Sequence, residues 1–210
     1  MTEVVIPGDK LAEGNGVKAG HGAFRKGDAV YASVMGLANV AKGFAKVVPL
    51  KGTYMPHSGD HVIGVVEAKM GKGCFVDINA PYNGYLSFFG DKVFEPGELL
   101  IMEITHVNEI YKTDLDFAKP LYGGKLIEVS PVKIPRIVGR KASMVETLSN
   151  GSNCRIFIGR NGRIYLKGKE EDIARAEAAI RLIEREAHTK GLTDRVKSFL
   201  ETGEKDGNEE

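Results

Sequence analysis

Four residues in the last third of the chain, Gly139, Arg140, Lys141 and Ala142, combine features that suit the binding of a polyanion. A glycine has no side chain, so a ligand can approach the backbone closely at Gly139. Arg140 and Lys141 add two positive charges at the same point. A helix after the loop would also direct its unpaired N–H groups and the positive end of its dipole at the ligand. A nucleic-acid backbone satisfies all three features; the alternative is an ordinary helix-turn-helix corner with solvated basic residues.

The residues on both sides of the loop predict two short helices that hold it. An extended apolar segment ends at Ile134 and runs into Pro135, whose fixed φ angle suits the first turn of a helix. This helix is predicted to end at Val138, because the loop then interrupts the apolar pattern. A second apolar period, which marks the next helix, consists of Met144, Val145 and Leu148.

The residues after the second helix predict a hairpin and a long helix. Residues 154–158 and 163–167 are short β-favouring runs, and residues 170–188 have the pattern of a helix with one buried stripe. Between the two runs, Gly159-Arg160-Asn161-Gly162 also has the spacing G-x-x-G. Because no helix follows it directly, we interpret this second string as a hairpin turn.

This order of elements resembles a KH domain, in which a GxxG loop between two helices clamps single-stranded RNA or DNA. Ala142 stands where the family usually has its second glycine, and its methyl group need not block the turn. We expect Gly139→Asp to weaken RNA capture without unfolding the chain. The RNA-binding residues that the resemblance implies here are Arg136, Gly139, Arg140, Lys141 and Ser143.

The middle of the chain predicts a small closed barrel of the OB type. Turn-forming residues at 57–60 mark its start, and five short strand-like runs follow within about sixty residues. The runs are residues 62–66, 74–78, 84–88, 99–106 and 114–118.

The motifs in this segment are GD, V-x-G-x-V, G-x-F-V-D-I and N-G-Y-L, followed by G-E before an alternating apolar strand. In this order they resemble an S1 domain, an OB-type binder of single-stranded RNA. The resemblance implies that Phe75 and Tyr85 stack on bases and that Lys69 and Lys72 contact phosphates. The alternative is that Phe75 belongs to the barrel core and that Tyr85 caps the surface.

The first 56 residues predict a small β-sandwich or barrel, because short strand-like runs alternate with glycine-containing turns. The glycine-rich run at 13–22 lacks the preceding buried strand and following helix of a nucleotide-binding loop. The chain is therefore a mixed β and α+β multidomain protein. The predicted parts are residues 1–56 (β domain), 57–122 (S1), 123–195 (KH) and 196–210 (disordered acidic tail).

The distribution of charge favours a polyanion partner for the KH-like part. The whole chain has a formal net charge of only +1, but residues 123–195 contain 15 Lys and Arg against 9 Asp and Glu. Residues 57–122 contain 5 against 10. The two widely separated cysteines suit reduced thiols in a cytoplasmic protein, and no apolar run is long enough for a membrane span.

The sequence contains no constellation that predicts catalysis, a metal site or a cofactor. His57 and His61 are four residues apart, but on a glycine-containing turn rather than a helix face. The other histidines, His21, His106 and His188, are scattered. Asp114 and Asp116 alternate on a strand and could hold Mg²⁺, although a polar outer face is the usual explanation.

Across nearly the whole chain, the combination of an N-terminal β domain with S1 and KH domains resembles the RNA-binding cap subunits of the archaeal exosome. The stretches that carry this resemblance include VVIPGD, YASVMG, KVVPLKGTYMPHSGD and HVIGVV. It implies a non-catalytic protein that captures single-stranded RNA and guides its 3′ end to a ring of 3′ to 5′ phosphorolytic exoribonuclease subunits. Three copies would sit on a hexameric ring of RNase-PH-like subunits through their N-terminal domains.

Two other functions remain open. The chain could be a free-standing single-stranded RNA-binding protein that acts in translation or RNA metabolism. It could also be a nuclease that uses Asp114 and Asp116.

Overall fold

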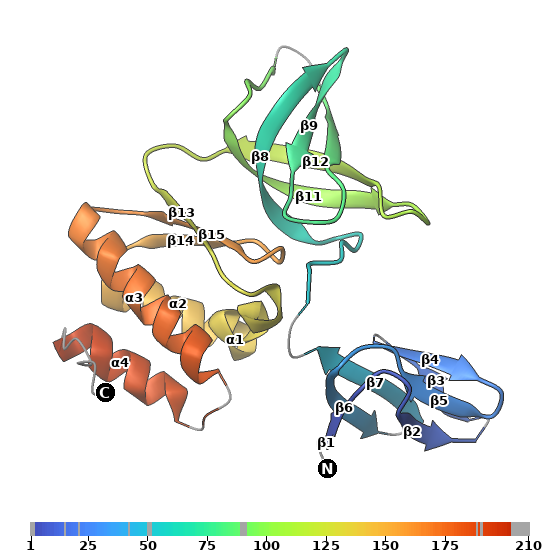
Figure 1. Cartoon of the computed structure of the whole chain (residues 1–210). Helices are drawn as coiled ribbons and strands as arrows, with labels where there is room; N and C mark the ends of the chain where they lie inside the picture. Colours follow the sequence, from blue (N-terminus) through green and yellow to red (C-terminus); the bar gives the residue numbers. More distant parts are fainter. Residues whose placement is uncertain are drawn as a thin grey trace. The chain divides into compact units, whose positions relative to one another are not determined.

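The computed structural model describes residues 3–14, 16–20, 22–41, 43–49, 52–88, 92–187, 189 and 191–202 (Figure 1). The chain divides after Gly52 into two compact units, Met1–Gly52 and Thr53–Glu210. The predicted boundary lay after residue 56. Each unit is described by itself below.

The first unit consists of two small sheets, as the predicted β-sandwich requires. One sheet has the order β1-β6-β7-β3 and the other β2-β5-β4. A few small apolar side chains, among them Val5, Ala32 and Val47, form its core. The strands are β1 (Glu3–Val5), β2 (Lys10–Glu13), β3 (Lys18–Ala19), β4 (Ala23–Lys26), β5 (Ala29–Ala32), β6 (Gly36–Ala41) and β7 (Phe44–Pro49).

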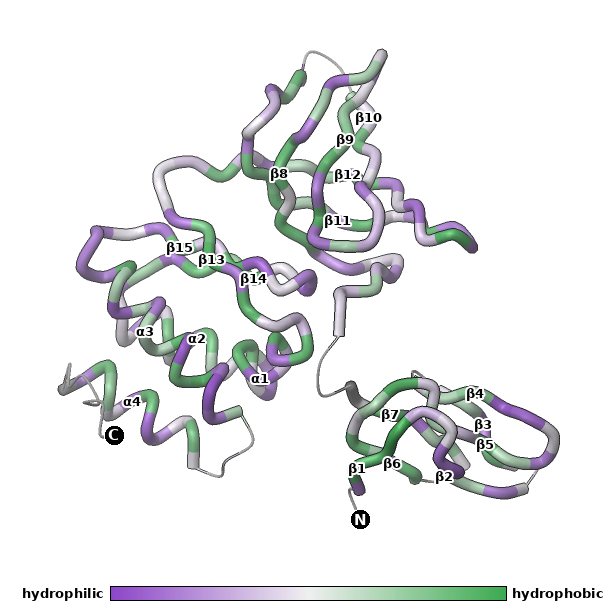
Figure 2. The backbone as a smooth tube through the Cα atoms, in the orientation of Figure 1, coloured by the Kyte–Doolittle hydropathy of each residue, from purple (hydrophilic) through white to green (hydrophobic). Residues whose placement is uncertain are grey.

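The second unit begins with a closed five-stranded barrel of the order β10-β12-β11-β8-β9, which confirms the predicted OB-type architecture. The pairing of β10 with β12 is parallel and closes the barrel, whereas the other pairs are antiparallel. Hydrophobic stretches of β8 and β11 (green in Figure 2) supply much of the core. The strands are β8 (His61–Met70), β9 (Gly73–Asp77), β10 (Gly84–Ser87), β11 (Leu99–Val107) and β12 (Thr113–Pro120).

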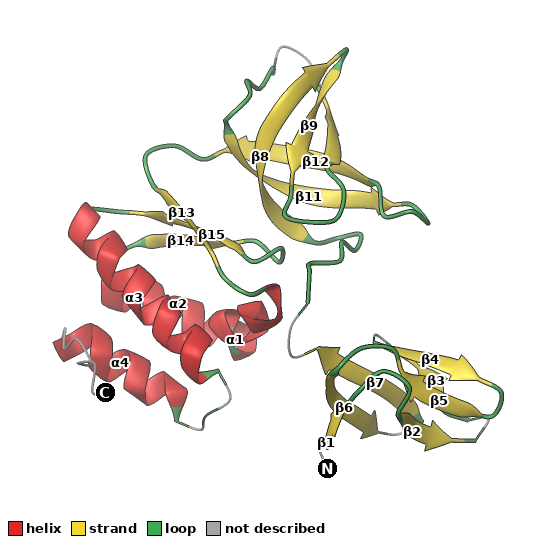
Figure 3. Cartoon of the chain, viewed as in Figure 1, coloured by secondary structure: helices red, strands yellow, loops and turns green. Residues whose placement is uncertain are grey.

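The rest of the second unit is an α+β domain, as predicted. A three-stranded sheet of the order β13-β15-β14 has the helices on one face (Figure 3), and the apolar core lies between the sheet and the helices. The strands are β13 (Lys125–Glu128), β14 (Arg155–Ile158) and β15 (Arg163–Lys167). The helices are α1 (Ile134–Val138), α2 (Ser143–Ser152), α3 (Glu170–Glu186) and α4 (Leu192–Thr202), with short 3₁₀ turns at Pro131–Lys133 and Arg140–Ala142.

Two predicted boundaries were wrong. The segment before α1 is not extended up to Ile134, because a 3₁₀ turn already begins at Pro131. The C-terminal tail does not begin at residue 196, because α4 continues to Thr202 and buries Val196 and Leu200 against the other helices. Residues 203–210 of the predicted tail lie outside the described residues. No helix in the described part of the chain is long and apolar enough to cross a membrane.

The turn at residues 159–162 fixes the sheet of the α+β domain to the barrel. Asn161 is fully buried, and its side-chain amide donates hydrogen bonds to the carbonyls of Ile63 (2.7 Å) and Ile78 (2.8 Å). Its Oδ1 accepts from the N–H of Ile63 at 3.3 Å. The side chain of Asn79 donates to the Asn161 carbonyl at 2.9 Å. The predicted turn is therefore also a contact between the two modules.

A buried arginine and an apolar cluster complete this contact. Arg163 donates to the carbonyl (2.6 Å) and the carboxylate (2.5 Å) of Asp77 in the barrel, and to the carboxylate of Glu128 at 2.9 Å. Next to these bonds, Ile63 of β8 packs with Tyr165 of β15 in one apolar cluster. The barrel and the α+β domain are thus joined by polar and apolar contacts at once.

Candidate nucleic-acid interface

The loop between α1 and α2 exposes both of its basic side chains. Gly139 has φ 75° and ψ 176°, and Lys141 and Ala142 both adopt left-handed conformations, with φ 53° and 64°. The side chains of Arg140 and Lys141 are exposed to solvent. Ala142 is the N-cap of α2 and makes no side-chain hydrogen bond to the helix. The Ser143 N–H donates to the Arg140 carbonyl. The next N–H groups at the start of α2 have no side-chain cap and lie beside two cations, which suits the binding of an anion.

Gly139 has no room for a side chain. A Cβ atom at this position would lie 2.7 Å from both the backbone nitrogen and the Cβ of Met144, and the positive φ adds strain. Met144 itself belongs to the buried core. The expectation that Gly139→Asp would spare the fold is therefore wrong, and the loop is better tested through Arg140 and Lys141.

Arg136, which the KH resemblance assigns to RNA, is engaged with the end of α3 instead. Its Nε donates to the carbonyl of Ala187 at 2.7 Å, and one terminal nitrogen donates to the carbonyl of Thr189 at 3.3 Å. A cation at the C-terminal end of a helix satisfies unpaired carbonyls and the negative end of the dipole. Ser143 is exposed as the first residue of α2, beside Lys141.

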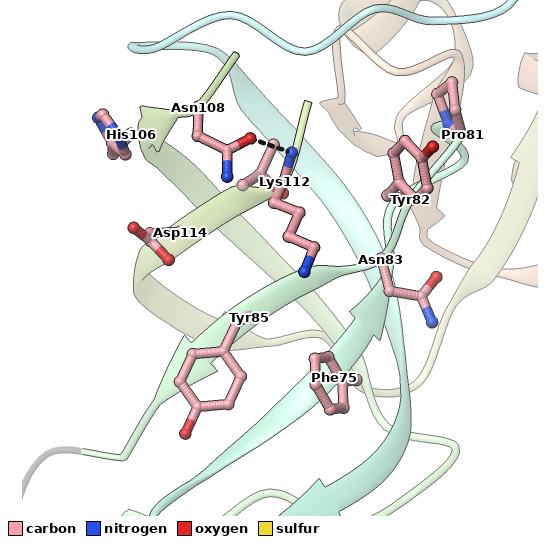
Figure 4. A pocket seen from close by; sticks show the side chains of 10 residues that line it. Phe75, Pro81, Tyr82, Asn83, Tyr85, His106, Asn108, Lys112 and Asp114 are labelled. Carbon is pink, nitrogen blue, oxygen red and sulfur yellow. Dashed lines mark hydrogen bonds between the residues drawn. The ribbon is translucent and has the colours of Figure 1, made fainter. Parts of the chain in front are cut away.

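The barrel carries a second candidate surface, a hollow of about 730 Å³ on its outer side (Figure 4). Phe75 of β9 and Tyr85 of β10 are direct neighbours in the sheet, and their rings meet edge to face, with centroids 5.5 Å apart. Both side chains are half-buried and line the hollow. Neither lies in the barrel core, so both remain available for stacking on a base.

The two lysines that the S1 resemblance assigns to phosphates do not line this hollow. Lys69 forms an ion pair with Glu95. It lies opposite the buried Cys74 in the sheet, and therefore on the other face from Phe75. Lys72 is exposed in the turn between β8 and β9.

Eight other residues that line the hollow were not assigned to RNA from the sequence. They are Pro81, Tyr82, Asn83, His106, Asn108, Lys112, Thr113 and Asp114. Asn108 holds the turn between β11 and β12, because its Oδ1 accepts the backbone N–H of Lys112 at 2.8 Å. Lys112 directly precedes β12 and lines the same hollow as Tyr85, because β12 pairs in parallel with β10. No local pattern in the sequence reveals that pairing.

The described residues contain no candidate metal site. No group of three or more His, Cys, Asp or Glu in this part of the chain could hold a metal ion. Asp116 accepts the backbone N–H of Phe117 at 2.7 Å, and only Asp114 of the pair lines the hollow. Nδ1 of His57 lies 3.8 Å from the carboxylate of Asp60. His21 and His188 lie outside the described residues.

Comparisons with known proteins agree with the fold. Residues 2–51 match the family described as the exosome RNA binding protein RRP4 N-terminal domain, and residues 124–172 match the KH domain family. A crystal structure described as that of an exosome complex RNA-binding protein is 35% identical, with a TM-score of 0.65. It covers 71% of this chain and 96% of its own.

Curated relatives cover almost all of the sequence. Exosome complex component Rrp4 of Methanothermus fervidus is 39% identical over 94% of this chain and 95% of the relative. The proteins of the same name from Methanosarcina acetivorans and Thermococcus kodakarensis are 39% and 36% identical, each over 94% of this chain and over 81% and 84% of their own lengths. The resemblance to exosome cap subunits is thereby confirmed, and the chain belongs to the family of Rrp4 exosome components.

Proposed function

We propose that this chain is a cytoplasmic, non-catalytic RNA-binding component of an exosome. It captures single-stranded RNA and guides the 3′ end to a ring of 3′ to 5′ phosphorolytic exoribonuclease subunits. The names of the Rrp4 relatives and of the matching crystal structure support this role.

The observation that carries this proposal is the presence of two surfaces suited to RNA within one compact unit. The hollow beside Phe75 and Tyr85 offers aromatic rings, and the loop at Arg140 and Lys141 offers cations beside a helix N-terminus. The buried Asn161 ties the two modules together. Because one strand can bind both modules, modest affinity at each surface is sufficient for capture.

The partners in this proposal are RNase-PH-like ring subunits, with three copies of the chain on a hexameric ring. The N-terminal unit would dock on the ring. It matches the RRP4 N-terminal family and exposes the large apolar side chains of Val4, Ile6 and Met35. Such side chains suit a protein interface more than a solvated surface.

Removing the two loop charges tests the RNA-binding role. We expect the double variant Arg140→Ser with Lys141→Ser to lose roughly tenfold or more in affinity for single-stranded RNA at low salt. The slope of log affinity against log salt concentration should become less steep by about two, one for each lost phosphate contact. Lys169→Ser with Arg175→Ser removes the same charge from exposed positions elsewhere in the domain and serves as the control. Equal affinities of the loop variant and the wild type would contradict the proposal.

Two further measurements separate the alternatives. The mass of the native complex from cell extract distinguishes an exosome subunit from a free-standing RNA-binding protein, which needs no stoichiometric partner. Incubation of the purified chain with labelled RNA, Mg²⁺ and phosphate tests the nuclease alternative. Degradation without partners would support a nuclease and contradict a non-catalytic role.

A further inference from the structure

Side chains from four neighbouring strands form one row along the hollow. Phe75 of β9 lies opposite Tyr85 of β10, and Tyr85 in turn lies opposite Asp114 of β12. On its other side, Asp114 lies opposite His106 of β11. Residues in register on adjacent strands share a face, with their Cβ atoms about 5 Å apart. All four line the hollow, and Figure 4 shows Asp114 between His106 and Tyr85.

Asp114 is the member of this row that does not suit a phosphate. A carboxylate repels phosphates and can only accept hydrogen bonds. The Asp114 side chain is exposed and forms no hydrogen bond or ion pair with another described residue. The Thr105 hydroxyl donates to the backbone carbonyl of Asp114 at 3.2 Å, and not to its carboxylate. A free carboxylate beside an aromatic pair is therefore placed to accept a hydrogen bond from the ligand.

We propose that Asp114 makes the hollow select adenine, cytosine and guanine, which carry an exocyclic amino group, over uracil. This inference rests on the proposed RNA-binding function. A base stacked on Tyr85 brings its edge toward the next residue of the row, Asp114. An exocyclic amino group donates to the carboxylate. Uracil has no such group, and the two carbonyl oxygens that flank its single N–H are repelled by the carboxylate.

Lys112 allows the same hollow to bind the phosphate as well as the base. Its side chain extends from the rim toward the side where Phe75 and Tyr85 lie (Figure 4). A lysine attracts the backbone of any sequence, whereas hydrogen bonds to base edges discriminate between sequences. Lys112 therefore contributes affinity for RNA of any sequence, whereas Asp114 contributes selectivity between bases.

The binding of labelled oligo(A), oligo(C) and oligo(U) of equal short length to the full chain tests this assignment. By fluorescence anisotropy at low salt, we expect oligo(A) and oligo(C) to bind about tenfold more tightly than oligo(U). In Asp114→Asn, whose amide both donates and accepts, the three affinities should fall within about twofold, mainly through tighter binding of oligo(U). Asp116→Asn removes the same charge from the same strand outside the hollow and should keep the preference.

Each other outcome overturns the inference in a recognisable way. A preference that persists in Asp114→Asn shows that another residue selects the base. Equal binding of all three oligonucleotides by the wild type refutes the selectivity and leaves the RNA-binding role intact, whereas no binding of any of them contradicts that role itself. A preference that EDTA abolishes would assign Asp114 to a metal ion. A preference that is lost in Arg140→Ser with Lys141→Ser would assign selectivity to the α1–α2 loop.

Discussion

The side-chain amide of Asn161 bonds to both backbone groups of Ile63. It donates to the Ile63 carbonyl at 2.7 Å and accepts the Ile63 N–H at 3.3 Å. Asn161 therefore supplies hydrogen-bond partners to the backbone N–H and C=O of Ile63 in β8, much as the backbone of a neighbouring strand would. Both residues are fully buried, so water does not replace these bonds when the side chain is removed. The turn at residues 159–162 of the α+β domain therefore completes the backbone hydrogen bonding of the barrel.

Asn161→Ala should lower the free energy of unfolding of this unit by about 2–4 kcal/mol. The substitution leaves a buried N–H and buried carbonyls without partners, and each such group costs about 1–3 kcal/mol. Urea denaturation followed by circular dichroism measures the change. Asn150→Ala, at an exposed position on α2, is the control and should change stability by less than about 0.5 kcal/mol. Equal stabilities of the two variants would show that the turn is not docked on the barrel in solution.

The ion pair between Asp77 and Arg163 predicts a loss of stability in acid. Burial opposes the ionisation of Asp77, but the hydrogen bonds from Arg163 and from the Asn79 backbone outweigh it and hold the pKa of the carboxyl below its ordinary value of 3.8. A lowered pKa means that the folded state favours the charged form. The resulting stabilisation is complete above the ordinary pKa and is lost as the pH falls through the lowered value.

Denaturation between pH 7 and pH 2 checks this prediction. In the wild type, the contribution of Asp77 to the free energy of unfolding should be lost only below about pH 4. In Asp77→Asn, the free energy of unfolding should lack that part of the pH dependence. The variant should also be less stable at pH 7, because Arg163 is buried and would lose its charged partner. Parallel pH profiles of the two proteins would contradict the assigned role of Asp77.

Ala142→Gly should stabilise the protein slightly, although glycine usually destabilises. Ala142 has φ 64°, and a left-handed conformation costs a residue with a Cβ about 1–2 kcal/mol. Glycine removes that cost but loses about 0.5–1 kcal/mol through the greater freedom of the unfolded chain. The expected net gain is about 0.5 kcal/mol, measured by urea denaturation.

The same substitution in a right-handed helix provides the control. Ala178 is exposed within α3, so Ala178→Gly should lower the free energy of unfolding by about 1 kcal/mol. The two variants should therefore shift stability in opposite directions. A loss at Ala142 as large as that at Ala178 would mean that the loop is not left-handed in solution.

Elements that are marked by a pattern of neighbouring residues could be predicted from the sequence. Alternating apolar runs located the five barrel strands, and the interruption after Val138 located the loop with Arg140 and Lys141. The hairpin turn at residues 159–162 was also recognised. Its docking on the barrel was not, because the partners of Asn161 lie more than eighty residues away and no local pattern points to them.

Strand pairing in the barrel explains why the lysines predicted from the sequence differ from the lysine that lines the hollow. Lys69 was chosen because it is basic and near G-x-F, but the register with Cys74 places it on the opposite face from Phe75. Lys112 joins the hollow through the parallel pairing of β10 with β12, which follows from barrel closure rather than from adjacency in the chain. A resemblance to a family gives the type of surface, whereas register decides which side chains reach it.

Lysine-to-alanine substitutions distinguish the two faces of the barrel. Lys112 lines the hollow with Phe75 and Tyr85, so Lys112→Ala should weaken binding of single-stranded RNA several-fold and reduce the salt dependence by about one phosphate contact. Lys69→Ala removes the same charge from the opposite face, where Lys69 already pairs with Glu95, and should leave RNA affinity within about twofold of the wild type. Filter binding at two salt concentrations measures both effects. Should Lys69→Ala weaken binding as much as Lys112→Ala, RNA does not enter the hollow, and the outer aromatic pair is a structural feature of the barrel.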